Sequence, residues 1–334
     1  MFNNLVNIHD LSTLLKRGPE VFSKLASRLV RGRRGRTKAA WAHTVNPPHN
    51  WWDIPAVRAR WNRLISGDPQ VDYCEYIARK HLAGRNSLRA LSLGCGTGYR
   101  ELRWAELGHF SCIDAYDLSE PRIQKAVDAA NKEGYGDIIN YRVGDIYKME
   151  MREDYYDVVF GEQSLHHFSP LKEILLRVNG FLRPDGCFVV NEFVGPTRFQ
   201  WTDRQMEAAN NLLSDLPAGY RTLWNSKSIK RKVFRPGRLR MILGDPSEAV
   251  ESSKIMPLLR EIFDVVEVRE YGGTVLHLLF SGIAHNFLSD DAETRRRLDI
   301  CFEAEDSLLR KGEIQSDFIV AVCRKKPHYP HSAG

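Results

Sequence analysis

The stretch Ala-Leu-Ser-Leu-Gly-Cys-Gly-Thr-Gly, residues 90–98, joins a short apolar strand to a turn that is rich in glycine, and a run that favours helix follows over residues 100–107. Glycine suits such a turn because its backbone adopts angles closed to other residues and lets a ligand approach without an intervening Cβ. The glycines are spaced GxGxG, whereas dinucleotide-binding turns show GxGxxG. The stretch therefore predicts a ligand-binding turn between a strand and a helix.

The residues beyond this turn repeat the same strand and helix period. Strands are predicted over residues 110–116, 138–143 and 156–160, and they lead to Asp117, Asp145 and Glu162. Open parallel sheets bind ligands at the carboxyl ends of their strands, which is where these acidic residues fall. Asp117 lies 19 residues after Gly98, a position from which a carboxylate accepts hydrogen bonds from both hydroxyls of a ribose. The pattern predicts a nucleoside site.

Five ordered motifs between Leu88 and Glu192 resemble those of class I S-adenosylmethionine (SAM)-dependent methyltransferases. The matching segments are residues 93–98, Asp117 in Tyr-Asp-Leu-Ser, Asp145 in Val-Gly-Asp-Ile, residues 156–167 and residues 181–190. The resemblance implies an α/β, Rossmann-like fold with a seven-stranded, mostly parallel sheet whose last strand is antiparallel. It also implies SAM as the cofactor and methyl transfer as the activity.

The resemblance also implies which residues contact the cofactor. Asp117 matches the acid that binds the ribose, Asp145 matches the acid at the adenine edge, and Cys95 and Thr97 contribute backbone groups. The side chain of Glu162 either holds the amino group of the cofactor or caps a turn. The full predicted set is Gly94, Cys95, Gly96, Thr97, Gly98, Asp117, Leu118, Asp145, Ile146 and Glu162.

Two adjacent histidines, His166 and His167, follow the fourth predicted strand. A hydroxyl acceptor must lose its proton during methyl transfer, and an imidazole with an ordinary pKa near 6.5 suits this task at neutral pH. The alternative is that the pair caps or packs the start of the next helix. Only one of the two can easily face the site, because successive residues point in different directions. We predict no metal, since the six cysteines are scattered without a CxxC pair.

Charge and composition are those of a globular enzyme, with 43% hydrophobic and 27% charged residues. Nine Lys or Arg residues stand against two acidic ones in residues 1–40. This segment is predicted as two short helices. It is either a solvated tail or lid, or it contacts an anionic membrane surface through residues 10–38 or a phosphate-bearing substrate. The apolar runs are too short or too interrupted for a membrane span, which makes the cytoplasm the expected location.

The chain is predicted to divide into six regions. The larger segments outside the core are expected to enclose an acceptor of modest size. Helices are predicted over residues 71–82, 202–215, 275–288 and 292–310, strands over residues 265–271 and 318–324, and a second helix cap at residues 245–248. The regions are a basic segment (1–40), a helical cap (41–87), the SAM-binding core (88–195), an insertion or lid (196–263), the end of the sheet with a helical insertion (264–326) and a tail (327–334).

These features favour a bacterial methyltransferase that acts on a hydroxyl of a small molecule or a glycan sugar. The alternatives are an RNA or protein methyltransferase and a protein that binds SAM without catalysis. Nucleic acid is disfavoured because the chain outside residues 1–40 is nearly neutral, although residues 230–232 are Lys-Arg-Lys. The sequence does not indicate an oligomeric state.

Overall fold

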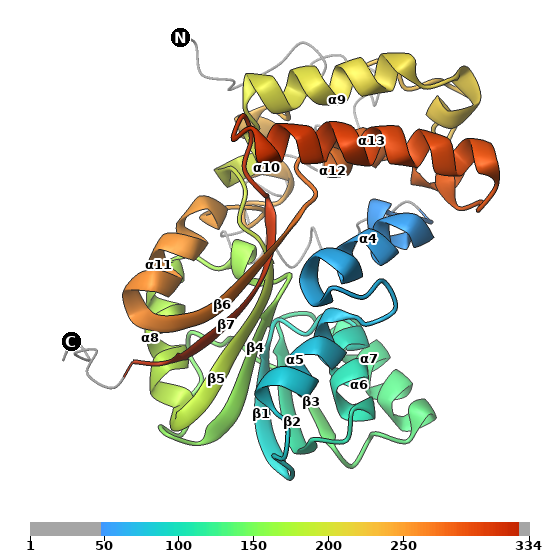
Figure 1. Ribbon diagram of the computed structural model, residues 1–334. Coiled ribbons are helices and arrows are strands. Elements are labelled where there is room, and N and C mark those ends of the chain that lie inside the picture. The colour runs from blue at the N-terminus through green and yellow to red at the C-terminus, as the bar shows by residue number, and fades with distance from the viewer. Residues whose placement is uncertain (1–47, 327–334) are drawn as a thin grey trace.

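A seven-stranded sheet forms the centre of the computed structural model, which describes residues 48–326 (Figure 1). The strand order is β3-β2-β1-β4-β5-β7-β6, and β7 runs antiparallel to both of its neighbours. This is the predicted Rossmann-like class I methyltransferase fold. The strands are β1 (Leu88–Leu93), β2 (Phe110–Asp117), β3 (Ile139–Val143), β4 (Tyr156–Glu162), β5 (Leu182–Phe193), β6 (Phe263–Gly272) and β7 (Phe318–Lys325).

Helices cover both faces of this sheet, because the buried strands present apolar side chains to both sides. In β1, Ala90 packs into one hydrophobic core and Leu91 into the other. The first core lies under α4 (Pro55–Ser66), α5 (Tyr73–His81), α6 (Tyr99–Glu106) and α7 (Glu120–Glu133). The second lies under α8 (Leu171–Phe181) and α11 (Ile255–Ile262). The result is a three-layer sandwich.

A group of helices stands beyond the carboxyl ends of the first strands, at the top of Figure 1. It contains α9 (Asp203–Asp215), α10 (Arg238–Gly244), α12 (Leu276–Phe280) and α13 (Ala292–Arg310). The helix α12 packs against both α9 and α13. The predicted capping box starts α9, since the Thr202 side chain accepts from the Gln205 backbone N–H and the Gln205 side chain accepts from that of Thr202.

Two predicted helical features are wrong, and both errors have a local cause. The single helix over residues 275–288 ends after Phe280, and Gly282, with φ of +77°, separates it from the short 3-10 helix η6 (Ala284–Phe287). The cap predicted at residues 245–248 starts no helix. Asp245 instead accepts from the backbone N–H and the hydroxyl of Ser247, which closes a turn.

Other short 3-10 helices connect the main elements: η1 (Trp51–Asp53), η2 (Leu165–His167), η3 (Thr197–Phe199), η4 (Ala218–Arg221) and η5 (Ser252–Lys254). Within residues 48–326, every helix is too short or too polar to cross a membrane. The predicted N-terminal helices and the membrane contact through residues 10–38 lie outside the described residues.

Candidate functional site

A cavity lies at the carboxyl ends of β1 to β4, where the sequence predicts the nucleoside site. Each of these strands contributes residues at its carboxyl end or directly after it, and Ser247 from the insertion adds to the lining. The lining residues are Gly94, Tyr116, Asp117, Leu118, Arg122, Gly144, Asp145, Ile146, Tyr147, Gln163, Ser164, His167, Phe168, Ser169 and Ser247. The fold thus brings together residues that are more than 150 positions apart in the sequence.

The glycine turn after β1 packs closely against the exit of β4. Gly94 has φ of +72°, and a Cβ there would lie 2.8 Å from the Cβ of Ser164. Any larger residue would therefore push the two loops apart. The absence of a Cβ in this turn was predicted to let a ligand approach. At Gly94 it instead lets another part of the protein approach. At Gly96 the space is open, with only an Arg122 nitrogen at 4.0 Å.

The Asp117 carboxylate holds the glycine turn in place. One oxygen accepts from the Gly96 backbone N–H at 3.0 Å, and the other accepts from the Ser119 N–H at 2.8 Å. The side chain is buried, and this burial raises the pKa of Asp117. A carboxylate oxygen has more than one lone pair, so Asp117 retains acceptor capacity toward the cavity that it lines.

Asp145 and Ile146 form the opposite side of the cavity, directly after β3. Asp145 accepts from the Tyr147 backbone N–H at 3.1 Å, which fixes the turn. Ile146 is buried, and the Tyr147 and Phe168 rings meet edge to face with centroids 6.0 Å apart. This side of the cavity therefore combines flat apolar surface with polar groups at its edge.

Half of the predicted cofactor residues line the cavity and half do not. Gly94, Asp117, Leu118, Asp145 and Ile146 are lining residues, whereas Cys95, Gly96, Thr97, Gly98 and Glu162 are absent from the lining of this cavity.

Glu162 is fully buried behind the glycine turn, next to α6. Both of its oxygens accept from the Trp104 indole N–H at 3.2 Å. Burial raises the pKa of Glu162 to about 7, and the positive charge of Arg100 opposes this shift. A cofactor contact by Glu162 stays a prediction.

His166 is clamped by a carboxylate that sequence reasoning missed. Its Nδ1 lies 2.5 Å from an oxygen of Glu192, a side chain at the end of β5 with no solvent exposure. The backbone N–H groups of Ser164, Leu165 and Phe193 also donate to this carboxylate. Burial alone would lower the pKa of His166, but Glu192 raises it to about 9. The feature of the sequence that could have indicated this contact is the presence of a glutamate within an otherwise apolar strand.

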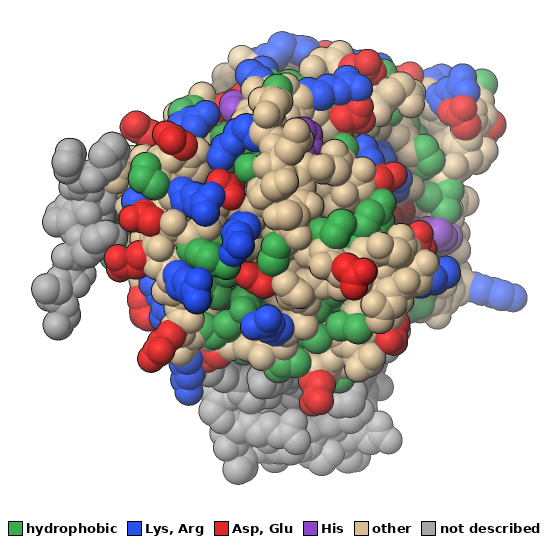
Figure 2. Space-filling view, turned by 90° about the horizontal axis from the view of Figure 1, so that it is seen from below, with side chains coloured by type: hydrophobic (Ala, Val, Ile, Leu, Met, Phe, Trp, Pro, Cys, Tyr) green, Lys and Arg blue, Asp and Glu red, His purple; other side chains and the backbone are tan. Residues whose placement is uncertain are grey.

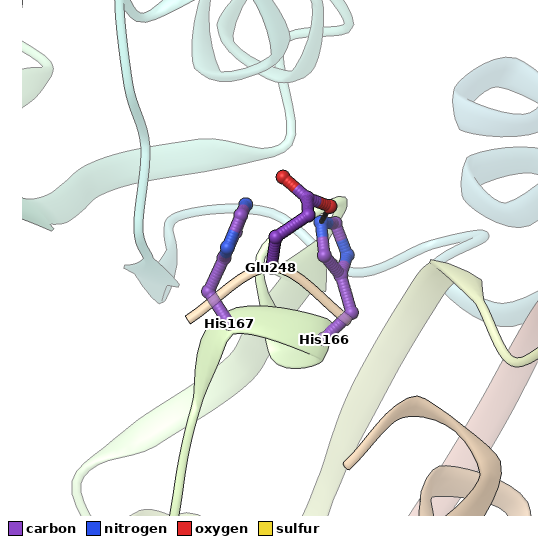
Figure 3. Close-up of side chains that lie close together, drawn as sticks. All are labelled: His166, His167 and Glu248. Carbon is purple, nitrogen blue, oxygen red and sulfur yellow. Dashed lines mark ion pairs between the residues drawn. The ribbon is translucent and has the colours of Figure 1, made fainter. Parts of the chain in front are cut away.

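His167 lines the cavity, and the insertion holds its ring. Its Nδ1 is 3.1 Å from the Ser247 hydroxyl, which itself donates to Asp245 at 2.6 Å. Burial lowers the pKa of His167 well below its usual value, and the neighbouring His166 lowers it further. The two imidazole rings lie against each other with centroids 4.1 Å apart, and the Glu248 carboxylate lies beside them (Figure 3), with an oxygen 3.6 Å from His166 Nε2.

The loop at residues 245–250 is firmly attached to the exit of β4. The Val250 backbone N–H donates to the His166 carbonyl at 3.0 Å. The Arg198 guanidinium donates to the carbonyls of Pro246 and Glu248, at 2.7 and 3.0 Å. Sequence reasoning placed a helix cap here and missed the loop, because these contacts join segments about 50 to 80 residues apart.

Comparison with known proteins identifies the core. Residues 91–190 match the family model described as a methyltransferase domain. The chain contains a class I SAM-dependent methyltransferase domain. The cofactor of this methyltransferase domain is SAM.

Two curated proteins are similar to this chain over part of its length. The 27-O-demethylrifamycin SV methyltransferase of Amycolatopsis mediterranei (strain S699) is 28% identical over 117 residues, which cover 34% of this chain and 43% of that protein. The malonyl-[acyl-carrier protein] O-methyltransferase of Bacillus cytotoxicus is 28% identical over 191 residues, covering 52% and 65%. The chain thus spans less than two thirds of either relative.

Among solved structures, a geranyl diphosphate methyltransferase in complex with SAM is 13% identical. The match covers 80% of this chain and 90% of that one, with a TM-score of 0.47.

Proposed function

We propose that this methyltransferase binds SAM in the cavity at the ends of β1 to β4 and transfers its methyl group to a hydroxyl of a small molecule or a glycan sugar. The observation that carries the proposal is the cavity itself, which joins Asp117, Asp145 and His167 in one space. A nucleoside site and a candidate proton acceptor therefore share one chamber.

The residues of the cavity fit an adenosyl group. Asp117 offers a buried carboxylate for the ribose hydroxyls, and Asp145 offers one for an amino group at the base edge. Leu118 and Ile146 supply apolar surface for the faces of the base. The open space at Gly96 leaves the main chain accessible. Bound SAM supplies a sulfonium-activated methyl group, and the residues of the chain orient the acceptor and exclude water.

We assign the role of general base, which removes the proton of the acceptor hydroxyl, to His167 rather than to His166. His167 lines the cavity, whereas His166 stands behind it and is bound by Glu192. The hydrogen bond between His167 Nδ1 and the Ser247 hydroxyl fixes the orientation of this ring at the wall of the cavity, as acid–base work requires. His166 is then a positioning residue that holds the turn η2 against β5.

An oxygen acceptor agrees with the names of the two relatives, which describe methyl transfer to oxygen. The loop at residues 245–250, with the rest of the insertion at residues 196–263, forms a lid that restricts the acceptor to modest size.

A nucleic-acid acceptor is not supported by the basic residues of this insertion. The half-buried Lys230 side chain donates from its ammonium to the carbonyls of Leu278, Leu279 and Ser281, so it stabilises the end of α12. On the side of the molecule opposite to these helices, seen from below in Figure 2, basic side chains also lie among acidic ones. A groove that binds a phosphate backbone would be lined mainly by basic side chains.

Steady-state kinetics with radiolabelled SAM and a panel of hydroxylated acceptors tests this function. His167→Ala should lower kcat by about 10²–10⁴-fold, the usual contribution of a general base, with unchanged SAM affinity. His285→Ala, at a histidine outside the cavity, is the matched control. If His167→Ala turns over as fast as the control, the assignment of the base is wrong; if no acceptor is methylated by the wild type, the proposed function fails.

A further inference from the structure

The side chains of His166, His167 and Glu248 converge on one point at the exit of β4 (Figure 3). One candidate ligand atom from each of them lies within 4.8 Å of the other two. Two imidazoles and one carboxylate form a ligand set that binds zinc and related divalent ions in proteins. Three such side chains from two distant segments therefore make a candidate metal centre.

The spacing between His166 and Glu248 fits a shared ion better than a direct contact. Their closest nitrogen and oxygen are 3.6 Å apart, which is long for a hydrogen bond between these groups. Two ligands at about 2.0–2.1 Å from a tetrahedral zinc ion lie about 3.4 Å from each other. A small rotation of the partly exposed Glu248 side chain would close the set around an ion.

Both histidines already have the outer partners that metal-bound histidines use. Such a histidine donates its other ring N–H to a carboxylate, carbonyl or hydroxyl, which fixes the ring and its tautomer. His166 has the buried Glu192 on Nδ1, and His167 has Ser247, which is backed by Asp245. In His166 this arrangement directs Nε2 toward Glu248.

The third ligand is held in place by the lid. Arg198 donates to the Glu248 carbonyl, and the Val250 N–H donates to the His166 carbonyl. The segment that carries Glu248 is therefore pinned to the segment that carries both histidines. Two positive groups, Arg122 and Arg198, lie close enough to influence His167 and oppose a cation. The carboxylates of Glu192, Asp245 and Glu248 offset them.

We propose that His166, His167 and Glu248 bind one divalent transition-metal ion of the zinc type at the wall of the SAM cavity. A tetrahedral ion with three protein ligands keeps one open position. His167 lines the cavity, so this position suits a hydroxyl or carboxylate oxygen of the acceptor. When the ion is bound, His167 is a metal ligand and does not act as the general base. The ion then stabilises the deprotonated form of the acceptor. This inference goes beyond the proposed function, and ion binding alone requires neither SAM nor acceptor.

Calorimetric titration of the chelator-treated full-length protein with Zn²⁺ tests the site, with Co²⁺ absorption in the visible range as a second readout of the ligand set. We expect one Zn²⁺ per chain. His167→Gln and Glu248→Gln should weaken binding by at least about 100-fold, and Ser247→Ala by about 10-fold through its outer contact. Glu153→Gln changes an exposed carboxylate and is the matched control.

Thermal unfolding of each variant without metal shows whether it is folded, and only folded variants are compared. Zinc binding that is absent in the wild type, or equal in Glu248→Gln and Glu153→Gln, overturns the inference. Titration of the same stripped samples with SAM separates the two proposals. SAM binding without zinc binding removes the metal site alone, whereas zinc binding without SAM binding removes the proposed function alone.

Discussion

Glu192 and Glu162 are buried carboxylates near the ends of neighbouring strands, and they differ in how their negative charge is compensated. Glu192 meets a histidine and three backbone N–H groups, so its negative charge is compensated. Glu162 accepts from the Trp104 indole and interacts with Tyr73 and with the charge of Arg100, but burial outweighs these contacts and raises its pKa to about 7. The difference comes from the neighbours that the fold supplies, because both residues end strands of the same sheet.

The raised pKa of Glu162 predicts a pH dependence of stability. In the unfolded chain its pKa is near 4.5, so between about pH 4.5 and about pH 7 the native state binds more protons than the unfolded state. The free energy of unfolding therefore falls as the pH rises through this window, by up to about 3 kcal/mol from this group. Glu162→Gln removes the ionisation and retains an acceptor for Trp104.

Urea unfolding without SAM at several pH values measures this effect. The variant should gain stability over the wild type as the pH rises from about 5 to about 8. Glu153→Gln, at the exposed surface, should show no such trend. A constant difference between Glu162→Gln and wild type across this range would contradict the assignment.

At the scale of elements, the strands and several of the helices followed from the sequence, whereas the break after α12 and the irregular loops did not. The alternation of apolar residues predicted β1 to β4 within one or two residues. The helix α13 was predicted near residues 292–310, and the structure confirms it, with the Asp291 side chain capping its first turn. The loop at residues 245–250 was predicted as a helix cap, because the Asp-Pro-Ser-Glu pattern is compatible with either structure. Long-range contacts from Arg198 decide between them.

Arg198 is therefore expected to control the order of the lid. Arg198→Lys loses the planar fork that spans the Pro246 and Glu248 carbonyls, and it should cost about 1–3 kcal/mol of local stability. Hydrogen exchange measured by mass spectrometry should then be faster over residues 245–250. Arg204→Lys, which alters exposed ion pairs of α9, is the control. Equal exchange in the two variants would show that the lid is held by other contacts.

At the scale of the molecule, the sequence predicted the sheet and its ligand edge but missed the partners that complete the site. Asp117 and Asp145 were identified because strand ends follow from a local period. Glu192, Ser247 and Glu248 meet the two histidines only through folding over distances of 26 to 80 residues or more. Local patterns carry no information about such pairings. The cavity is therefore formed by the whole fold. The roles proposed for its residues depend on SAM being its ligand.

Calorimetric titration of SAM into the wild type, Asp117→Ala and the exposed control Asp137→Ala tests that claim most directly. We predict one SAM per chain in the wild type and the control. We expect Asp117→Ala to bind it more weakly by about 1–3 kcal/mol, since the ribose hydroxyls lose a charged acceptor. Failure of the wild type to bind SAM, or equal affinity in Asp117→Ala and Asp137→Ala, would contradict the account.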